Sequence, residues 1–315
     1  MSRVGDATLP IEYDSHGHLI SPFYGYWPTQ YVCFIYVALF GLATLLHLGQ
    51  AIRYRTWWLL PTAVLAGVGE TIGWGGRLWS SYQPLVQNPF LIQIVCTIVS
   101  ATPLVGALFI SFGRLVVPAG EQYSRLSPRL YGRIFLTVDF IALVVQSAGG
   151  GLAATAESAS GSKLGSNIML AGIVFQLIFL VMFAVLAMEY FWRLWKDVPI
   201  RPARLQTTSS DSTQYESSPQ GPMEKPLKQL AEAICLMTIL LLIRAVYRTI
   251  ELADGWDGKV IQTEIYFDIF DGAMITLAMY TLSLAHPGRL LRDAARLRAW
   301  GKIPPGFKQE SSSVV

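Results

Sequence analysis

The chain has few charged residues for its length. Only 14% of its 315 residues are Asp, Glu, Lys or Arg, whereas a soluble domain carries about a quarter. Its hydrophobic share is 52% and its mean hydropathy is +0.42. Seven apolar stretches are each near the ~20 residues that cross a bilayer, which leaves no room for a separate catalytic domain. They cover residues 30–51, 57–79, 89–112, 134–151, 166–190, 229–250 and 264–285.

Cysteine is scarce as well. Cys33, Cys96 and Cys235 all fall inside predicted spans, so none is expected to form an exposed bridge, and no Cys-x-x-Cys spacing is present. No His or Asp cluster has metal-ligand spacing, and we expect neither a metal nor a cofactor. The N-terminus lacks a basic region followed by a short apolar core. The first apolar stretch is therefore expected to stay as a helix and not to be cleaved.

Several motifs that define other membrane proteins are missing. The Gly-x4-Gly-Lys-Ser/Thr loop of a nucleotide-driven pump is absent. Residues 264–285 contain no lysine for the Schiff base of a microbial rhodopsin. A G-protein-coupled receptor shares the topology, but no acid precedes Gly113-Arg114 and the seventh stretch has no Asn-Pro-x-x-Tyr. An intramembrane hydrolase would need clustered acids and histidines, and without that spacing we predict that the chain is not an enzyme.

The loops predict how the bundle is oriented. The segment before the first stretch and the second, fourth and sixth loops together hold 3 Lys and Arg, against 18 in the other loops and the tail. This asymmetry is a strong positive-inside signal. It places residues 1–29 on the exoplasmic side, a seven-helix membrane domain over residues 30–288, and a cytosolic tail over residues 289–315. The net charge of +3 reflects these cytosolic loops and indicates no nucleic-acid partner.

Two cytosolic segments lie outside the predicted bundle. Residues 201–228 are rich in Ser, Thr, Pro and Gln and are typical of a disordered loop. Within the tail, residues 289–300 place Leu290, Ala294 and Leu297 on one helical face and Arg side chains on another. Such a short amphipathic helix favours anchoring on the anionic inner leaflet.

Ionisable residues inside the spans are the main functional signal, because each is costly in a bilayer unless it faces a polar interior. Glu70 and Arg77 are seven residues apart, on one face of the second helix. Arg244, Arg248 and Glu251 recur at helical spacing in the sixth, and Glu264, Asp268 and Asp271 do so in the seventh. With the N-terminus outside, three helices bring these charges to a similar depth in the outer half.

Two interpretations fit this set of charges. It is either a structural network that fixes helix packing, or the lining of a cavity for a polar head group or coupling ion. Gln146 and Gln176 lie nearer the middle of the bilayer and Asp139 toward the cytosolic side. The candidate ligand-binding residues are Glu70, Arg77, Asp139, Gln146, Gln176, Arg244, Arg248, Glu251, Asp268 and Asp271.

Small residues add a packing signal. The spacing Gly69-x-x-x-Gly73 in the second helix allows two helix backbones to approach closely. The triple glycine over residues 149–151 ends the fourth helix and is either a packing site or a hinge.

The order and spacing of these motifs resemble the fungal lipid-translocating exporter family, the group related to the yeast aminocholesterol-resistance protein. The resemblance covers residues 57–288, with Trp74 where many members have Tyr. The matching residues are Glu70, Gly73, Arg77, Pro103, Gly113-Arg114, Asp139, Gln146, Gly149-Gly150-Gly151, Gly172, Gln176, Arg244, Tyr247, Arg248, Glu251, Glu264, Tyr266, Asp268 and His286-Pro287-Gly288.

The resemblance implies an all-α protein with seven transmembrane helices in the plasma membrane or an internal membrane of a fungal cell. It also implies that the partners are membrane lipids or amphipathic small molecules, such as sphingoid bases or sterol-like toxins. The predicted function is the binding of such a molecule and its movement across the membrane, with resistance to stress or drugs as the outcome. A seven-helix receptor that senses lipids and signals through its cytosolic loops is the alternative.

Overall fold

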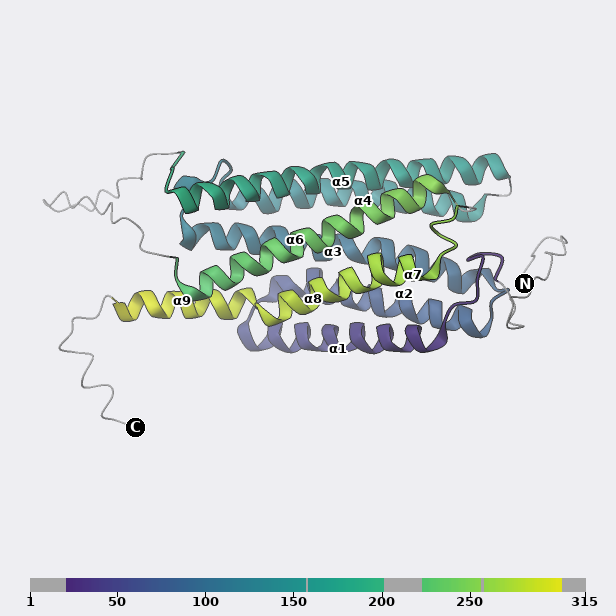
Figure 1. The fold of residues 1–315 in the computed structure, drawn as a ribbon, viewed down its shortest axis with the longest axis horizontal. Coiled ribbons are helices and arrows are strands. Elements are labelled where there is room, and N and C mark those ends of the chain that lie inside the picture. The colour runs from purple at the N-terminus through teal and green to yellow at the C-terminus, as the bar shows by residue number, and fades with distance from the viewer. Residues whose placement is uncertain (1–20, 157, 201–222, 256–257, 302–315) are drawn as a thin grey trace, which may run out of the picture.

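The computed structural model describes residues 21–156, 158–200, 223–255 and 258–301, and these ranges are helical apart from their connecting segments. Most of the helices lie side by side along one axis (Figure 1). The α-helices are α1 Gln30–Tyr54, α2 Leu65–Tyr82, α3 Gln87–Ala119, α4 Pro128–Thr155, α5 Ala159–Lys196, α6 Lys225–Asp254, α7 Glu264–Phe267, α8 Met274–Leu284 and α9 Pro287–Gly301.

Two π-helical segments extend these helices. The segment η2, Leu60–Val64, contains Pro61 and follows the 3-10 turn η1, Trp57–Leu59, so that residues 57–82 form one helical stretch with α2. The segment η4, Asp268–Ala273, joins α7 to α8. A second 3-10 turn, η3, covers Glu121–Tyr123. Asp268 and Asp271 lie within η4. Because π-helical segments are frequent at functional sites, this position favours a functional role for the two acids.

Six helical segments of the described chain are long and apolar enough to cross a membrane: Gln30–Tyr54, Gln87–Ala119, Pro128–Ala153, Ser160–Lys196, Lys225–Asp254 and Glu264–Ala299. The predicted stretch 57–79 is helical but is not among them. Its glycines and its two ionisable residues, Glu70 and Arg77, lower its apolar character. The chain is therefore an all-α membrane protein with several spans.

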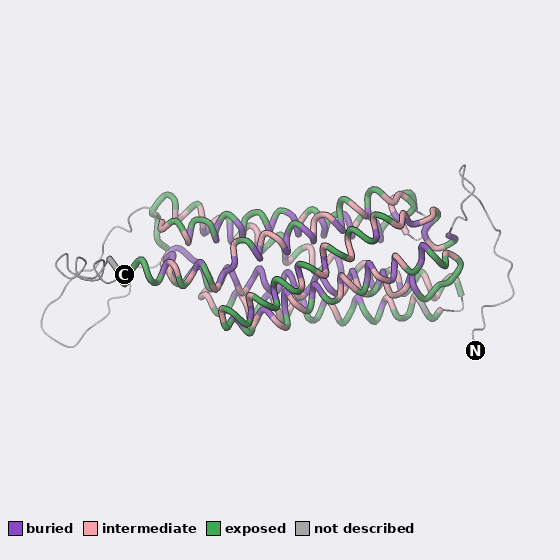
Figure 2. The backbone as a smooth tube through the Cα atoms, turned by 90° about the horizontal axis from the view of Figure 1, so that it is seen from below, coloured by how far each residue is buried: buried purple, intermediate pink, exposed green. Residues whose placement is uncertain are grey.

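The helix α3 is central. In its most apolar window 72% of the residues are buried, against 22% in α1, and buried residues line the inside of the bundle while exposed ones cover its outside (Figure 2). The C-terminal half of α3 packs tightly on α4 and α5 through aromatic rings. Phe109, Phe112, Tyr131 and Phe183 have ring centroids 4.6–5.3 Å apart in the contacts Phe109–Phe183, Phe112–Tyr131 and Phe112–Phe183.

Small residues bring α2 against α3 as the sequence predicts. A Cβ atom added at Gly69 would lie 2.7 Å from the Cβ of Ser100, and one at Gly73 would lie 2.7 Å from the Cγ2 of Thr97. Both distances are too short for a real contact. The two glycines therefore hold α2 close to the polar residues of α3.

The contact between α4 and α5 depends on Gly149. A Cβ atom there would lie 2.5 Å from the backbone nitrogen of Met169 and 2.8 Å from the carbonyl oxygen of Gly165. Because both neighbours are backbone atoms, Gly149→Ala must push the helices apart, and we expect it to lower the free energy of unfolding by about 1–3 kcal/mol. Gly151→Ala is the matched control, because no atom lies within 4 Å of its added Cβ. Thermal unfolding in detergent measures both; equal melting temperatures would contradict the packing argument.

The helix α9 occupies the place predicted for the amphipathic helix and extends beyond α8 along the bundle axis (Figure 1). Leu290 and Ala294 are buried in the hydrophobic core, and Arg298 pairs with Glu224 at 2.7 Å. Its apolar face thus packs in part on protein, and its position on the inner leaflet stays a prediction. Leu297 stays exposed.

The predicted loop over residues 201–228 ends earlier than expected. Residues 225–228 form the first turn of α6, where Pro226 is tolerated because the first backbone N–H groups of a helix have no partner in the helix. The predictions for residues 1–20, 201–222 and 302–315 lie outside the described residues.

Candidate functional site

The deep charge cluster consists of Glu70, Arg244, Arg248, Glu251 and Asp271. Asp271 is fully buried, and its carboxylate accepts hydrogen bonds from Arg244 Nε at 3.0 Å and from Arg248 Nε and Nη2 at 2.8 Å each. Arg248 Nη1 donates to Glu251 at 2.8 Å. The charges of Arg244, Arg248, Glu251 and Asp271 are thus compensated by one another, which is how buried ions are tolerated.

The same two arginines attach α6 to α3. Arg244 Nη2 donates to the backbone oxygen of Thr97 at 2.7 Å, and Arg248 Nη2 donates to its hydroxyl at 2.8 Å. Tyr247 adds a hydrogen bond to Glu251 at 2.9 Å. The cluster therefore joins α6, η4 and α3 into one unit.

Glu70 is the exception within this cluster. Its side chain is fully buried, and its Oε1 accepts a hydrogen bond from Ser100 at 2.6 Å. Its Oε2 has no hydrogen-bond partner in the part of the chain that the structure describes. It takes part in no described ion pair.

The outer charge cluster consists of Arg77, Glu264 and Asp268. Arg77 Nη2 lies 3.1 Å from Glu264 Oε1 and 3.7 Å from Asp268 Oδ1. Glu264 also accepts hydrogen bonds from the backbone and hydroxyl of Thr29, both at 2.7 Å. The two acids are partly exposed, with 20% and 14% of their side chains accessible.

The segment that precedes α1 covers this outer cluster. Tyr26 accepts a hydrogen bond from Arg77 Nη2 at 2.8 Å, and Tyr24 donates to Gln93 at 2.5 Å. Burial raises the pKa of Tyr24 to about 12, so its hydroxyl keeps its proton and acts as a donor at physiological pH. The sequence pattern provides no signal for these two tyrosines.

Phe267 lies between the two clusters. Its ring centroid is 4.7 Å from the guanidinium carbon of Arg77 and 5.0 Å from that of Arg248. Both distances are typical of cation–π contacts. The charges that the sequence places at one depth thus form two separate groups with an aromatic ring between them.

A third polar group joins α3, α4 and α5. Gln146 Nε2 donates to Gln176 at 3.0 Å, and Gln176 donates to Thr102 at 3.2 Å. Asp139 lies beside Gln176 and is 2% exposed. Its Oδ2 has no hydrogen-bond partner, and no Lys or Arg of the described ranges forms an ion pair with it.

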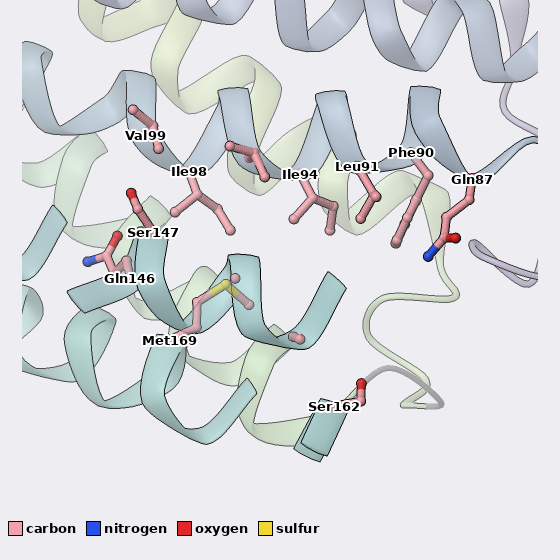
Figure 3. A pocket seen from close by; sticks show the side chains of 13 residues that line it. Gln87, Phe90, Leu91, Ile94, Ile98, Val99, Gln146, Ser147, Ser162 and Met169 are labelled. Carbon is pink, nitrogen blue, oxygen red and sulfur yellow. The ribbon is translucent and has the colours of Figure 1, made fainter. Parts of the chain in front are cut away.

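The main pocket lies between the N-terminal half of α3 and the helices α4 and α5, with a volume of about 140 Å³. Figure 3 shows side chains of α3 facing those of α4 and α5 across it. Most of its lining is apolar. The lining residues are Gln87, Phe90, Leu91, Ile94, Val95, Ile98, Val99, Gln146, Ser147, Gly150, Ala153, Ser162 and Met169.

A smaller pocket of about 20 Å³ shares Ile98 and Gln146 with the main one and so adjoins it. Gln176, Arg244 and Arg248 also line it. Of the ten candidate residues, these three and Gln146 thus lie at a pocket. The others line neither of the two described pockets: Glu70, Arg77, Asp139, Glu251, Asp268 and Asp271.

Some contributors to the site carry no distinct sequence signal. The pocket stripe of α3 has Phe90, Ile94 and Ile98 at spacings of four, which is also the spacing of ordinary core residues. Thr97 and Ser100 contact ionisable groups of the deep charge cluster. Small hydroxyl residues within an apolar helix are only a weak sequence signal for such contacts. Among the described residues, no group of three His, Cys, Asp or Glu is placed to hold a metal ion.

An all-helical bundle with several spans, buried ion pairs and an apolar pocket defines a multi-pass membrane protein. The family model described as "RTA1 like protein" matches residues 63–294. The chain belongs to this family, which confirms the resemblance indicated by the order of its motifs.

Three relatives are named proteins of Saccharomyces cerevisiae. The "Sphingoid long-chain base transporter RSB1" is 28% identical over 80% of this chain and 70% of its own length. "Protein RTA1" is 28% identical over 69% of this chain and 62% of its own length, and "Protein RTM1" is 27% identical over 66% and 61%. No solved structure matches the chain. The first of these relatives associates the family with lipid transport.

Proposed function

We propose that the protein binds an amphipathic amine with a long alkyl chain between α3, α4 and α5 and moves it across the membrane. Support comes from the relative named a transporter of sphingoid long-chain bases, together with the chemistry of the pocket. Such export would give a fungal cell resistance to toxic amphiphiles.

The pocket stripe of α3 suits the alkyl chain. From Gln87 to Val99 the helix rises about 18 Å at 1.5 Å per residue, with apolar side chains along this face. Beyond the pocket, the aromatic rings in the C-terminal half of α3 and on the facing helices fill the space between these helices. An extended chain would therefore run along the exoplasmic half of α3.

Asp139 is the observation that carries the proposal. An acid buried in a membrane without a cation is costly, and an ammonium group of the ligand would compensate it. Asp139 itself lines neither pocket, but its neighbour Gln176 lines the smaller one. Gln176 and Gln146, which lines both pockets, supply an amide donor and acceptor for hydroxyl groups. We assign these three residues to the head group and the remaining candidates to the two charge clusters.

Asp139→Asn tests the amine site. We expect at least about a tenfold loss of affinity for a long-chain primary amine, equal to about 1.4 kcal/mol, because the ion pair is lost. The affinity for the alcohol of the same chain length should not change. Fluorescence binding in nanodiscs measures both ligands, and Asp293→Asn on α9 is the control. An equal loss for amine and alcohol would contradict the assignment.

Reconstitution into liposomes separates transport from sensing. Fluorescent sphingoid bases, sterols and phospholipids would be tested for binding and movement in the same vesicles. We expect the amines to bind and to change leaflet. Binding without movement would favour the lipid receptor, the alternative function.

We further propose seven spans, with residues 1–29 exoplasmic and residues 289–315 cytosolic. The distribution of Lys and Arg, 3 against 18, supports this orientation. The start of α1 and the helix α9 also lie at opposite ends of the bundle (Figure 1). Residues 57–82 would be the seventh span, with its two charges covered by α3, α7 and η4.

A further inference from the structure

The deep charge cluster contains one acid more than it has arginines to neutralise. Arg244 and Arg248 carry two positive charges, and Asp271 and Glu251 already provide two carboxylates in direct contact with them. Glu70 is the fifth ionisable group. If it were ionised in this arrangement, the cluster would hold an uncompensated negative charge inside the bilayer, which is strongly unfavourable.

The surroundings of Glu70 agree with a protonated side chain. The charged groups that act on it are Asp271 from η4 and Arg244 and Arg248 from α6, while α3 contributes Ser100 and Cys96. Only Ser100 is hydrogen bonded to it among the described residues. Its Oε2, which has no partner, is where the proton would reside.

The outer charge cluster also has one acid more than its arginine can neutralise, and both of its acids are partly exposed. Arg77 faces both Glu264 and Asp268. Glu264 is satisfied by Arg77 and Thr29, whereas Asp268 Oδ1 has no hydrogen bond among the described residues. Seven residues of α2, about 10 Å, separate the levels of Glu70 and Arg77. A second surplus acid, partly exposed, therefore lies at the outer end of the same bundle.

The deep charge cluster also borders the proposed ligand site. Arg244 and Arg248 contact Asp271 on one side and line the smaller pocket, with Gln146 and Gln176, on the other. Ionised Glu70 would give the cluster a net negative charge and favour an ammonium group in the adjoining pocket. Protonated Glu70 would leave the cluster neutral and remove that attraction.

We infer that the protein exchanges a proton for its amine ligand: binding of the ammonium group releases the proton of Glu70, and protonation of Glu70 expels the amine. This inference rests on the proposed function. The proton leaves the Glu70 carboxyl for bulk water. One positive charge replaces another, so the net charge of the bundle is unchanged.

The test measures proton release on binding. The purified full chain in weakly buffered detergent is titrated with a fluorescent long-chain trimethylammonium, which has no proton of its own to lose, while a pH-indicator dye reports released protons. We expect about one proton per bound ligand near neutral pH. Asp139 is also buried without a cation among the described residues, so the variants assign the proton. Glu70→Gln should bind the ligand without releasing a proton, Glu70→Asp should restore the release, and Asp139→Asn at saturating ligand should release it as the wild-type protein does.

The outcomes separate the two proposals. Absence of ligand binding by the wild-type chain would overturn the proposed function. Binding without proton release, or equal release by Glu70→Gln, would overturn the exchange alone. If Glu70→Gln does not fold, the proton count of the wild-type chain still decides, because a count near zero contradicts the exchange.

Discussion

Asp271→Asn is expected to lower the free energy of unfolding by about 3–5 kcal/mol, the usual cost of removing one partner from a buried ion pair. Asp271 is fully buried and receives three hydrogen bonds from two arginines. An amide would present one oxygen acceptor and an N–H₂ group that faces a guanidinium. Arg244 would then lose the carboxylate that compensates it inside the bilayer, and Arg248 would keep Glu251 alone.

Unfolding in detergent, followed by circular dichroism, measures this loss. The control is Glu232→Gln, which removes a carboxylate paired with Lys228 at 3.9 Å, where both side chains are about two-thirds exposed. We expect it to change the stability by less than about 0.5 kcal/mol, because exposed helical pairs contribute little. If the two variants unfold alike, the deep charge cluster is not what holds α6 to η4.

The sequence predicts the helices well, because a span must be long and apolar for reasons that do not depend on its neighbours. Every predicted stretch coincides with a helical segment of the structure, including residues 57–79 with their two charges. The ends are less well predicted. The helix α6 starts at Lys225 and α5 continues to Lys196, since polar residues extend a helix beyond the bilayer without any change in hydropathy.

The division of the charges into two clusters was not predictable. Similar depth on three helices permits many pairings, and the choice depends on how each helix is rotated. Phe267 separates Arg77 from Arg248, yet it is an ordinary apolar residue in the pattern. Likewise, the isolation of Asp139 from cations follows from the packing of α4 on α5, which the glycines indicate only in general terms.

The two halves of the α3–α4–α5 unit differ in a way that matters for function. Aromatic rings fill the space beside the C-terminal half of α3, while the N-terminal half leaves a pocket. The polar group of Gln146, Gln176 and Thr102 lies where the two halves meet. A ligand in the pocket would therefore have this polar group at one end, next to Arg244 in the smaller pocket.

Ile98→Trp is expected to reduce the affinity for a long-chain amine at least about tenfold, or 1.4 kcal/mol. Ile98 lines both pockets, so an indole there would occupy the space between the alkyl chain and the amide pair. Unlike Asp139→Asn, this change should lower the affinities for an amine and an alcohol of equal chain length to the same extent. The indole would exclude the alkyl chain of either ligand, whereas the carboxyl of Asp139 would stay in place. Fluorescence binding in nanodiscs measures both affinities.

Ile178→Trp is the matched control, because Ile178 is 58% exposed on the outer face of α5 and a larger side chain there would meet lipid. It should bind both ligands as the wild-type chain does, and thermal unfolding should show that both variants are folded. Unchanged binding by a folded Ile98→Trp would mean that the alkyl chain of the ligand lies elsewhere and approaches Asp139 from outside the α3 stripe.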